Sequence, residues 1–280
     1  MGKKHEFSKD EINFIINGYK NGKSRRQLKL IFGVSDNVIL RILKENNVNI
    51  RGIQEANTTK YFINKDFFNP TKFSADTAYI LGLFASDGYV CTKGNQCGIE
   101  LQEQDGAILD KINQVLQNER PVKSYINYSH NKEYHCKKLY FENKQLKSDL
   151  MYYNILPQKT YTCVNKNFME NIPDEYKFDF IRGMTDGDGC FTFGPKSTSP
   201  KWYICGSSIT TLLAIQDFLE NNNISTTISL ENKKDRNLQL YRVYCYSKEK
   251  IKKIYEKFYY PNVNLFLERK RKIAYNIIKE

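Results

Sequence analysis

Two aspartates, Asp87 and Asp188, occupy the same place in two copies of one short sequence pattern. The copies are AYILGLFASDGYV at residues 78–90 and DFIRGMTDGDGCF at residues 179–191. Two carboxylates placed side by side can hold a divalent cation such as Mg²⁺, which prefers oxygen ligands and keeps waters and phosphate oxygens in its shell. The repeat therefore predicts two similar half-domains that build one metal site between them, and hydrolysis at a phosphate is the chemistry that such a site suits.

Each copy of the pattern has the spacing of a helix with very small side chains on one face. The small residues recur four positions apart, namely Gly82 with Ser86 and Gly183 with Gly187. Two helices that meet through such faces can approach more closely than the usual interaxial distance of about 8–10 Å. The aspartates then end the two helices, and Gly88 and Gly189 supply the permissive backbone that stops each one. The negative ends of both helix dipoles favour a cation at this point.

The two patterns resemble the paired motifs of single-chain LAGLIDADG homing endonucleases. The resemblance spans roughly residues 76–275 and includes the segments IPDEYKFDFIRGMTDGDGCF, LPQKT and LFLERKRKIAY. It departs from the motif at Ala85 and Thr185. Ala85 replaces the motif's first Asp, which is not the metal ligand in the family. The resemblance implies that Asp87 and Asp188 are the metal-binding acids.

The segments that follow each Asp-Gly indicate the same order of elements in both halves. YVCTKGNQCGIELQEQD and CFTFGPKSTSPKWYICGSS are typical of hairpins, each is followed by a helical segment, and two more strand segments follow. The expected fold class is α+β, with two pseudo-symmetric αββαββα half-domains at residues 76–170 and 171–280 whose sheets form a DNA-binding saddle. The side chains expected on the free faces of these sheets, as DNA contacts, are Tyr89, Cys91, Lys93, Glu100, Gln102, Thr192 and Arg242.

Hydrolysis of a phosphodiester requires charge neutralisation at the phosphoryl group, an activated water and help for the leaving oxygen. Mg²⁺ supplies the first two, with Mn²⁺ as a substitute, and a nearby lysine can steady the developing charge. The resemblance implies further site residues: Lys144 and Lys248 as the basic groups, Glu103 and Ser207 as polar groups at the ends of the second strands, and Gly88 and Gly189 in the metal site.

Residues 1–51 predict a separate helix-turn-helix domain. Ser8 with Glu11 predicts the start of a first helix, Ser24 starts a second, Gly33 makes the turn, and Ser35 caps a third helix that runs to about residue 45. The inward residues of the third helix are Val38, Ile42 and Leu43. In such a domain the helix after the turn enters the major groove. The arrangement resembles LAGLIDADG homing endonucleases of the phage and bacterial type, which carry an N-terminal helix-turn-helix domain.

The exposed polar residues of this domain predict its DNA contacts. Asn37 and Arg41 suit base edges, whereas Arg25, Arg26 and Lys44 suit phosphates. A plain three-helix packing module is the alternative interpretation. Residues 52–75 predict a linker with a few aromatic anchors, because they show no sustained period and contain Pro70.

Charge and composition favour a polyphosphate partner. The chain of 280 residues has a formal net charge of +12, and residues 1–60 hold 12 Lys and Arg against 6 Asp and Glu, while residues 248–280 hold 10 against 4. Neutralised phosphates release counterions, so such clusters suit nucleic acid. The seven cysteines form no CxxC pair, which indicates reduced thiols, and His130, His135 and Cys136 make a poor zinc candidate. No segment suits a bilayer span or a signal peptide, so we expect a cytoplasmic protein of a bacterial cell or of a phage within it.

These features together predict a monomeric, site-specific double-strand DNA endonuclease that needs Mg²⁺ and no obligatory protein partner. Its target would be a long, imperfectly symmetric duplex, and the family precedent implies a staggered break with short 3′ overhangs. Two alternatives stay open: a non-cleaving transcription regulator of the same fold, which typically lacks the motif acids, and an RNA-splicing maturase. An intein-embedded enzyme is less expected, because the chain ends at AYNIIKE without a His-Asn splice junction.

Overall fold

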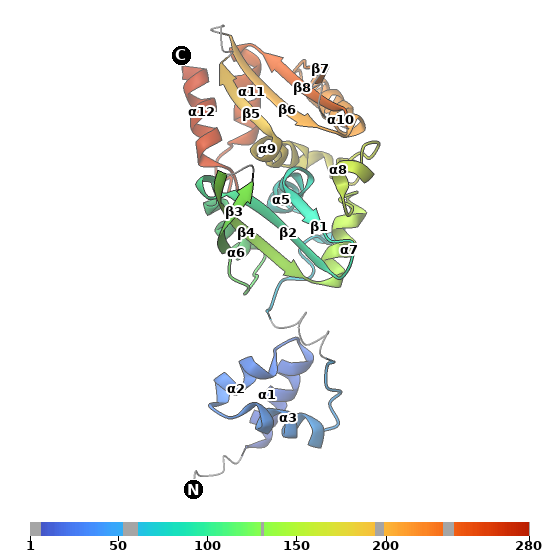
Figure 1. Ribbon diagram of the computed structural model, residues 1–280, viewed down its shortest axis with the longest axis vertical. Coiled ribbons are helices and arrows are strands. Elements are labelled where there is room, and N and C mark those ends of the chain that lie inside the picture. Colours follow the sequence, from blue (N-terminus) through green and yellow to red (C-terminus); the bar gives the residue numbers. More distant parts are fainter. Residues whose placement is uncertain (1–6, 53–60, 130–131, 194–198, 232–237, 280) are drawn as a thin grey trace. The chain divides into compact units, whose positions relative to one another are not determined.

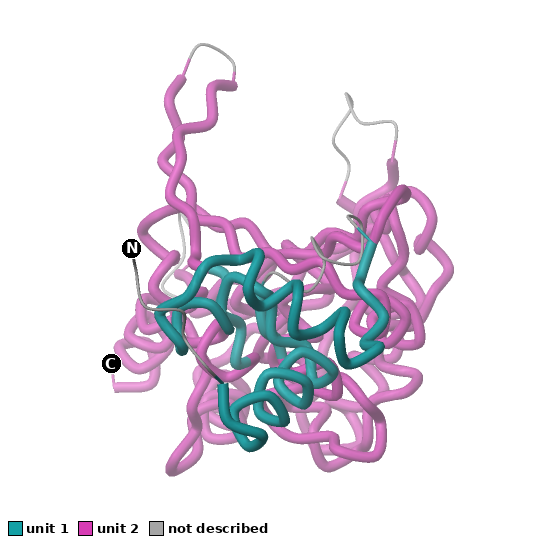
Figure 2. The backbone as a smooth tube through the Cα atoms, turned by 90° about the horizontal axis from the view of Figure 1, so that it is seen from below, with its two compact units in different colours: residues 1–63, 117–120 teal, residues 64–116, 121–280 magenta. Residues whose placement is uncertain are grey.

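The computed structural model of the protein describes residues 7–52, 61–129, 132–193, 199–231 and 238–279. The chain forms two compact units, which are coloured separately in Figure 2. Unit 1 comprises residues 1–63 with 117–120, and unit 2 comprises residues 64–116 with 121–280. Of the segment expected as a linker, residues 53–60 lie outside the described residues.

Unit 1 contains three short helices, α1 (Lys9–Lys20), α2 (Arg25–Phe32) and α3 (Asp36–Glu45). Ser8 and Ser24 each form a capping box, in which the serine hydroxyl accepts from the backbone three residues later and that residue's side chain accepts in return. Gly33 ends α2 in the left-handed conformation, with a φ of 64°, which glycine adopts without strain. The predicted helix boundaries are confirmed, although the Ser35 side chain makes no capping hydrogen bond.

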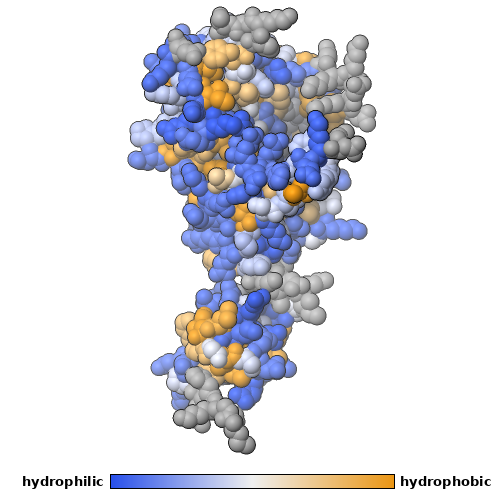
Figure 3. Space-filling view, turned by 60° about the vertical axis from the view of Figure 1, so that its left-hand side comes forward, coloured by the Kyte–Doolittle hydropathy of each residue, from blue (hydrophilic) through white to orange (hydrophobic). Residues whose placement is uncertain are grey.

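Apolar side chains of the three helices form the core of unit 1: Ile15, Tyr19, Leu28, Ile39, Ile42 and Leu43. Of the three residues predicted to face inward, Ile42 and Leu43 are buried and Val38 packs against the cluster while partly buried. Apolar side chains also gather on the surface of this unit, in the lower part of Figure 3. Its exposed large apolar residues include Phe14, Leu30 and Ile31.

Residues 64–74 lead into unit 2 through aromatic contacts. Phe68 is fully buried and packs edge-on against Phe84, with 6.0 Å between the ring centroids. The short helix η1 (Pro70–Lys72) follows, and Ser74 then caps the first motif helix by accepting from the backbone of Thr77. Aromatic anchors expected in this segment are therefore present from Phe68 onward.

Unit 2 repeats one order of elements twice. The first half contains α5 (Ala75–Ser86), β1 (Gly88–Val90), β2 (Gln96–Gln102), α6 (Ala107–Val115), β3 (Lys123–Ser129), β4 (Lys132–Glu142) and α7 (Lys144–Tyr152). The second half contains α9 (Lys177–Asp188), β5 (Gly189–Phe193), β6 (Pro200–Gly206), α10 (Ile209–Asn221), β7 (Thr227–Glu231), β8 (Leu240–Tyr246) and α11 (Lys248–Phe258). The predicted α+β class and the αββαββα order are both confirmed.

The strands of each half form an antiparallel sheet of four strands, in the orders β1-β2-β4-β3 and β5-β6-β8-β7. The other elements of unit 2 are η2 (Glu103–Asp105) between β2 and α6, α8 (Lys159–Thr162) and η3 (Asp174–Tyr176) between α7 and α9, and α12 (Glu268–Lys279) after α11. Side chains alternate along the strands, so that in β6 Trp202 and Ile204 are buried while Lys201, Tyr203 and Cys205 are not. One face of each sheet therefore covers a core and the other stays open.

Helices α5 and α9 pack together at the centre of unit 2, between the two sheets (Figure 1). A Cβ atom on Gly82 would lie only 2.9 Å from the backbone nitrogen of Met184, and one on Gly183 would lie 2.9 Å from that of Leu83. Because the two environments mirror each other, a pseudo-twofold axis runs between the helices. The close approach predicted from the small residues is confirmed. Among the described residues, none of the helices is both long and apolar enough to cross a membrane.

Candidate metal centre

Asp87 and Asp188 lie at the C-terminal ends of the two central helices. Asp87 is the C-cap of α5, with φ −94° and ψ −6°, and Asp188 is the last residue of α9. The small helix faces continue to this point, because a Cβ atom on Gly187 would overlap Ser86 Oγ and Asp87 Oδ2. Both helix dipoles thus direct their negative ends at the two carboxylates.

The glycines that follow the aspartates were expected to supply a permissive backbone, and this expectation is wrong. Gly189 has a φ of −102°, and Gly88 is not among the glycines with positive φ in the described chain. Space is what requires glycine here: a Cβ atom on Gly189 would lie 2.9 Å from the carbonyl oxygen of Tyr203, and one on Gly88 would lie 2.7 Å from that of Phe84. The glycines allow the first strand of each half to begin directly against its motif helix.

Burial and mutual repulsion act on the two carboxylates. Desolvation, followed by the charge of Asp188, raises the pKa of Asp87 from 3.8 to about 6. Desolvation also raises the pKa of Asp188. In both cases the opposing charges come from Lys159 and Lys270. A pair of partly desolvated carboxylates with raised pKa values is an environment that favours a bound cation.

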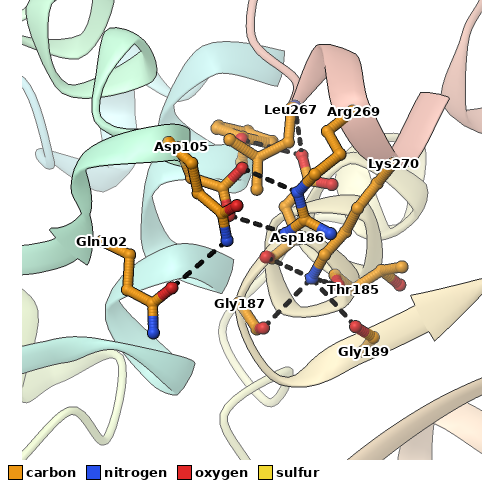
Figure 4. A network of polar contacts seen from close by, with 11 residues as sticks. Gln102, Asp105, Thr185, Asp186, Gly187, Gly189, Leu267, Arg269 and Lys270 are labelled. Atoms are coloured by element: carbon orange, nitrogen blue, oxygen red, sulfur yellow. Dashed lines mark hydrogen bonds and ion pairs between the residues drawn. The ribbon is translucent and has the colours of Figure 1, made fainter. Parts of the chain in front are cut away.

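Lys270, on α12, is buried in the end of α9, as the close-up in Figure 4 shows. Its ammonium donates to the carbonyl oxygens of Thr185 at 2.7 Å, Gly187 at 3.1 Å and Gly189 at 2.9 Å, and also to that of Asp186. Carbonyls in the last turn of a helix have no partner within the helix, so a buried ammonium both satisfies them and opposes the helix dipole.

Lys159, on α8, is the counterpart of Lys270. It donates to the carbonyl oxygen of Gly88, which is the residue equivalent to Gly189 in the first half. Desolvation lowers the pKa of Lys159, while the charges of Asp188 and Asp87 raise it. The two lysines therefore complete the pseudo-symmetry of the site.

Two further contacts fix α12 at the site (Figure 4). Asp186 is buried and its Oδ2 accepts from the Tyr79 hydroxyl at 2.9 Å and from the Leu267 backbone at 2.8 Å. The Arg269 guanidinium forms a bidentate ion pair with Asp105 of the first half, at 3.0 and 2.7 Å. Because Asp186 occupies the motif position that holds Ala85 in the other half, this anchoring is confined to one side of the pseudo-twofold axis.

A cavity of about 330 Å³ opens beside Asp188 and Lys159. It lies between the segment that joins the halves and the end of the second sheet, and Ser207 donates across it to the Thr160 carbonyl oxygen at 3.2 Å. Phe168 is among its apolar lining residues.

The residues at the helix ends fit a divalent cation. No cluster of three or more His, Cys, Asp or Glu side chains that could hold a metal occurs in the part of the chain that the structure describes. A cation at this place would therefore rest on Asp87 and Asp188, with carbonyl oxygens, waters and phosphate oxygens as its other ligands. That donor set is the one that Mg²⁺ prefers.

The four polar residues predicted around the metal lie at element ends. Lys144 and Lys248 are the exposed first residues of α7 and α11. Glu103 begins η2 and its carboxylate lies 3.7 Å from His135 Nδ1. The strand register pairs Gly88 with Ile99 and Gly189 with Ile204, so Ser207 is the counterpart of Gln102 and not of Glu103.

Sequence reasoning missed Lys159 and Lys270. Each is preceded three positions earlier by leucine, in LPQK and LERK, so a Leu-x-x-Lys signal occurs once after the last strand of each half. The pattern is short and the chain is rich in lysine, which is why only the contacts in the structure single these residues out.

The residues predicted on the free sheet faces lie in or beside the strands. In the first half, Lys138 lies over the Tyr89 ring at 4.6 Å and 3.8 Å from the Glu100 carboxylate. In the second half, Arg242 lies over the Tyr203 ring at 4.4 Å. The other predicted residues are placed as follows: Gln102 at the exposed end of β2, Cys91 just after β1, Lys93 exposed in the β1–β2 turn, and Thr192 within β5.

Unit 1 presents its predicted polar residues at or near its surface. Asn37, Arg41 and Lys44 are exposed on α3, and Arg26 is exposed on α2. Arg25 lies 3.4 Å from Asp36, and Arg41 lies 3.7 Å from Glu45.

Comparison with known protein families gives one match in each half of unit 2. A protein-family model described as a LAGLIDADG-like domain matches residues 74–151 and 175–259. The first match runs from the cap of α5 into α7, and the second runs from η3 to the end of α11. A search of curated proteins found none that matches the chain.

Several solved structures are similar to this chain. They include mesophilic variants of the homing endonuclease I-DmoI, with 16% identity over 72% of this chain and 97% of that chain and a TM-score of 0.46. The homing endonuclease I-WcaI bound to its DNA recognition sequence has 14% identity, over 74% and 91%, and a TM-score of 0.49. The N-terminal LAGLIDADG domain of DUF199/WhiA has 20% identity, over 75% and 93%, and a TM-score of 0.44.

Proposed function

The chain belongs to the LAGLIDADG-like domain family, and from that premise we propose that it is a site-specific homing endonuclease that cuts both strands of duplex DNA with Mg²⁺. One observation carries the proposal: Asp87 and Asp188 meet at the ends of the paired helices, and burial raises both pKa values. Two repelling carboxylates buried at a helix interface are unfavourable without a cation, which supports a metal-dependent role over that of a regulator or a structural module.

The aspartates would hold Mg²⁺, or Mn²⁺ in its place, together with backbone oxygens at Gly88 and Gly189. When bound, the ion would supply charge neutralisation at the phosphate and lower the pKa of a coordinated water. In hydrolysis the water oxygen bonds to phosphorus and the P–O3′ bond breaks. The products are a 5′-phosphate and a 3′-hydroxyl, with the water proton passing to solvent and the leaving oxygen taking one.

The protein's own basic residues would stabilise the charge that develops on the phosphate. Lys159 and Lys270 lie near the aspartates, and each places a positive charge close to where the phosphate would bind. Lys144, Lys248, Glu103 and Ser207 stay predictions for this role, since they lie at element ends that a bound duplex would approach.

The open faces of the two sheets would contact the DNA grooves. Cations lie over aromatic rings on the second sheet: Lys201 is 4.7 Å from the Tyr244 ring centroid and 5.1 Å from that of Tyr246. Such side chains suit phosphates and base edges. Because the two sheet faces carry different side chains, the preferred target would be long and only imperfectly symmetric, and one chain would suffice to bind it.

Unit 1 would add contacts outside the cleavage site as a helix-turn-helix domain. Its α3 exposes Asn37, Arg41 and Lys44, which suit a major groove. Residues 1–60 carry much of the excess positive charge, and this supports a phosphate-contacting role.

The test is to incubate the purified chain with genomic DNA of its source and of related genomes, with Mg²⁺ or with EDTA, and to sequence every new end. We expect recurrent, Mg²⁺-dependent paired ends. Asp87→Asn and Asp188→Asn should each abolish double-strand breaks and keep DNA binding, while Asp217→Asn, an exposed acid on α10, is the matched control.

Other outcomes identify the alternatives. Specific retention of DNA without breaks would indicate a regulator of the same fold. Binding of intron RNA, with neither breaks nor retention of DNA, would indicate a maturase. Loss of DNA binding in Asp87→Asn would show that this acid is structural.

A further inference from the structure

Lys159 and Lys270 occupy equivalent places in the two halves, yet their surroundings differ. Both follow the last strand of their half-domain in a Leu-x-x-Lys segment, and both donate to the carbonyl oxygen of the glycine after the motif aspartate. In a symmetric site both ammonium groups would make the same contacts and have the same role. The contacts of these two lysines differ.

Lys270 is fixed by its hydrogen bonds. Its ammonium has four carbonyl acceptors in or beside the last turn of α9, and the side chain is 6% exposed. The residue before it, Arg269, forms the bidentate ion pair with Asp105, which holds this end of α12 against the first half. With three N–H donors and four acceptors, Lys270 has no donor left for a substrate.

Lys159 is held far less tightly. Among the described residues, the Gly88 carbonyl oxygen is its one hydrogen-bond acceptor, so two of its three N–H donors remain for other groups. The residue before it is Gln158, which is exposed and makes no counterpart of the Arg269 ion pair in the described chain. Lys159 also lines the open cavity beside Asp188, whereas Lys270 does not.

On the premise of the proposed endonuclease function, we propose that the two lysines have different roles and that the DNA strands are therefore cut in a fixed order. Lys159 is the catalytic lysine: it swings from the Gly88 carbonyl oxygen to a non-bridging oxygen of the nearer scissile phosphate. Lys270 is a positioning residue that fixes the end of α9 and the carboxylate of Asp188. The strand beside Lys159 is cut first, and the product of that step is a nicked duplex.

The physical reason is the number of hydrogen bonds that each ammonium must give up. Lys159 releases one carbonyl, and Asp87 and Asp188 keep the ammonium close to the reacting phosphate. Lys270 would have to leave four buried carbonyls without partners, which is strongly unfavourable. Only the Lys159 ammonium is therefore able to move to the phosphate oxygen on which negative charge develops during the reaction.

The order of cutting can be measured on a supercoiled plasmid that carries the target, with the strands labelled differently. We expect the wild-type protein to accumulate nicked circles whose nicks lie in one strand. Lys159→Met should slow that first nick by about 10²-fold, the usual loss for one donor to a developing oxyanion, and should leave the other strand as the faster one. Lys272→Met, an exposed lysine on α12, is the matched control.

Lys270 is tested by a conservative change, because Lys270→Met is expected to disturb folding. Lys270→Arg keeps the charge and the donors, so it should keep both the strand order and most of the rate. Equal nicking of both strands by the wild-type protein, or an unchanged strand order in Lys159→Met, would overturn the proposal.

A second measurement does not depend on cleavage. The full chain is treated briefly with acetic anhydride, and the acetylation rate of each lysine is read by peptide mass spectrometry. Lys159 should react at least about tenfold faster than Lys270, because its N–H groups are less engaged. Equal rates would contradict the division of roles even if the protein cuts DNA, and a clear difference in a protein that cuts nothing would instead place the failure in the proposed endonuclease function.

Discussion

At the scale of single residues, the site is built at the expense of stability. Asp87 and Asp188 are buried together at the negative ends of two helices, and their raised pKa values show that the charged forms are unfavourable there. The charges of Lys159 and Lys270 lower the pKa of Asp87, but it stays above its usual value. Such unfavourable charge is typical of a site that keeps a place for a cation, because a bound ion offsets the repulsion only when it is present.

The unfavourable burial of the charged carboxylates predicts a pH-dependent stability in the metal-free protein. The pKa of Asp87 rises from 3.8 to about 6 on folding, so between these values the folded chain binds more protons than the unfolded chain. Stability should therefore fall as the pH rises through this window. Asp87→Asn should raise the free energy of unfolding by about 1–3 kcal/mol at pH 7 in EDTA and by little at pH 4.

Thermal melts of both proteins at pH 4, 5, 6 and 7, with and without Mg²⁺, check this. Mg²⁺ should raise the melting temperature of the wild-type protein more than that of Asp87→Asn. If the difference in melting temperature between the two proteins in EDTA does not grow with pH, the charged form of Asp87 is not the cause of the lost stability.

At the scale of elements, the small-residue faces of α5 and α9 determine the geometry of the site. The helices meet so closely at Gly82 and Gly183 that neither position has room for a side chain. The aspartates can therefore face each other only while both glycines are present. The C-terminal helix α12 adds a second constraint through Lys270 and Arg269.

Gly183→Ala tests the helix contact. The added methyl group would lie 2.9 Å from the backbone nitrogen of Leu83 and closer still to the Tyr79 carbonyl oxygen, so the helices must separate. We expect a loss of about 3 kcal/mol or more in the free energy of unfolding, measured by urea denaturation. Gly206→Ala is the control, since its new methyl group would meet only Leu212, at 3.9 Å, and a similar loss there would contradict the argument.

Asp105→Asn tests how α12 is fixed. The change removes the charge of a carboxylate that is 13% exposed and accepts twice from Arg269. Amide hydrogen exchange in α12 should become faster by about tenfold, while α11 changes little. Glu268→Gln, at an exposed carboxylate 3.9 Å from Arg271, is the control and should leave the exchange rates as they are.

At the scale of the whole molecule, the chain divides into two compact units. Unit 2 contains the paired sheets and the candidate metal centre, and unit 1 contains a small helical core of its own. If unit 1 reads DNA, removing residues 1–60 should weaken binding and shorten the DNase footprint by about one helical turn, because a recognition helix contacts one turn of major groove. The position of the cuts should not change. A footprint of unchanged length would exclude a DNA-reading role for unit 1.

The sequence predicted those parts of the molecule that depend on local rules. Capping serines placed the helices of unit 1, and the repeated motif placed α5 and α9 with their close contact. The conformation of Gly88 and Gly189 was predicted wrongly, because their need for space arises from neighbours such as Tyr203 that no local rule supplies. The roles of Lys159 and Lys270 were not predicted for the same reason, since their hydrogen-bond acceptors lie 71 and 81 or more positions away along the chain.

The contact between α5 and α9 also bears on how the protein is made. Every residue of α5 from Thr77 to Ala85 is buried, yet its partner helix α9 is synthesised about a hundred residues later. A nascent chain that has left the ribosome only as far as the first half therefore carries an apolar helix with no cover, a state that attracts chaperones and favours aggregation. A translation product interrupted before α9 also lacks Asp188, so under the proposed function such an unfinished chain could not complete the metal site.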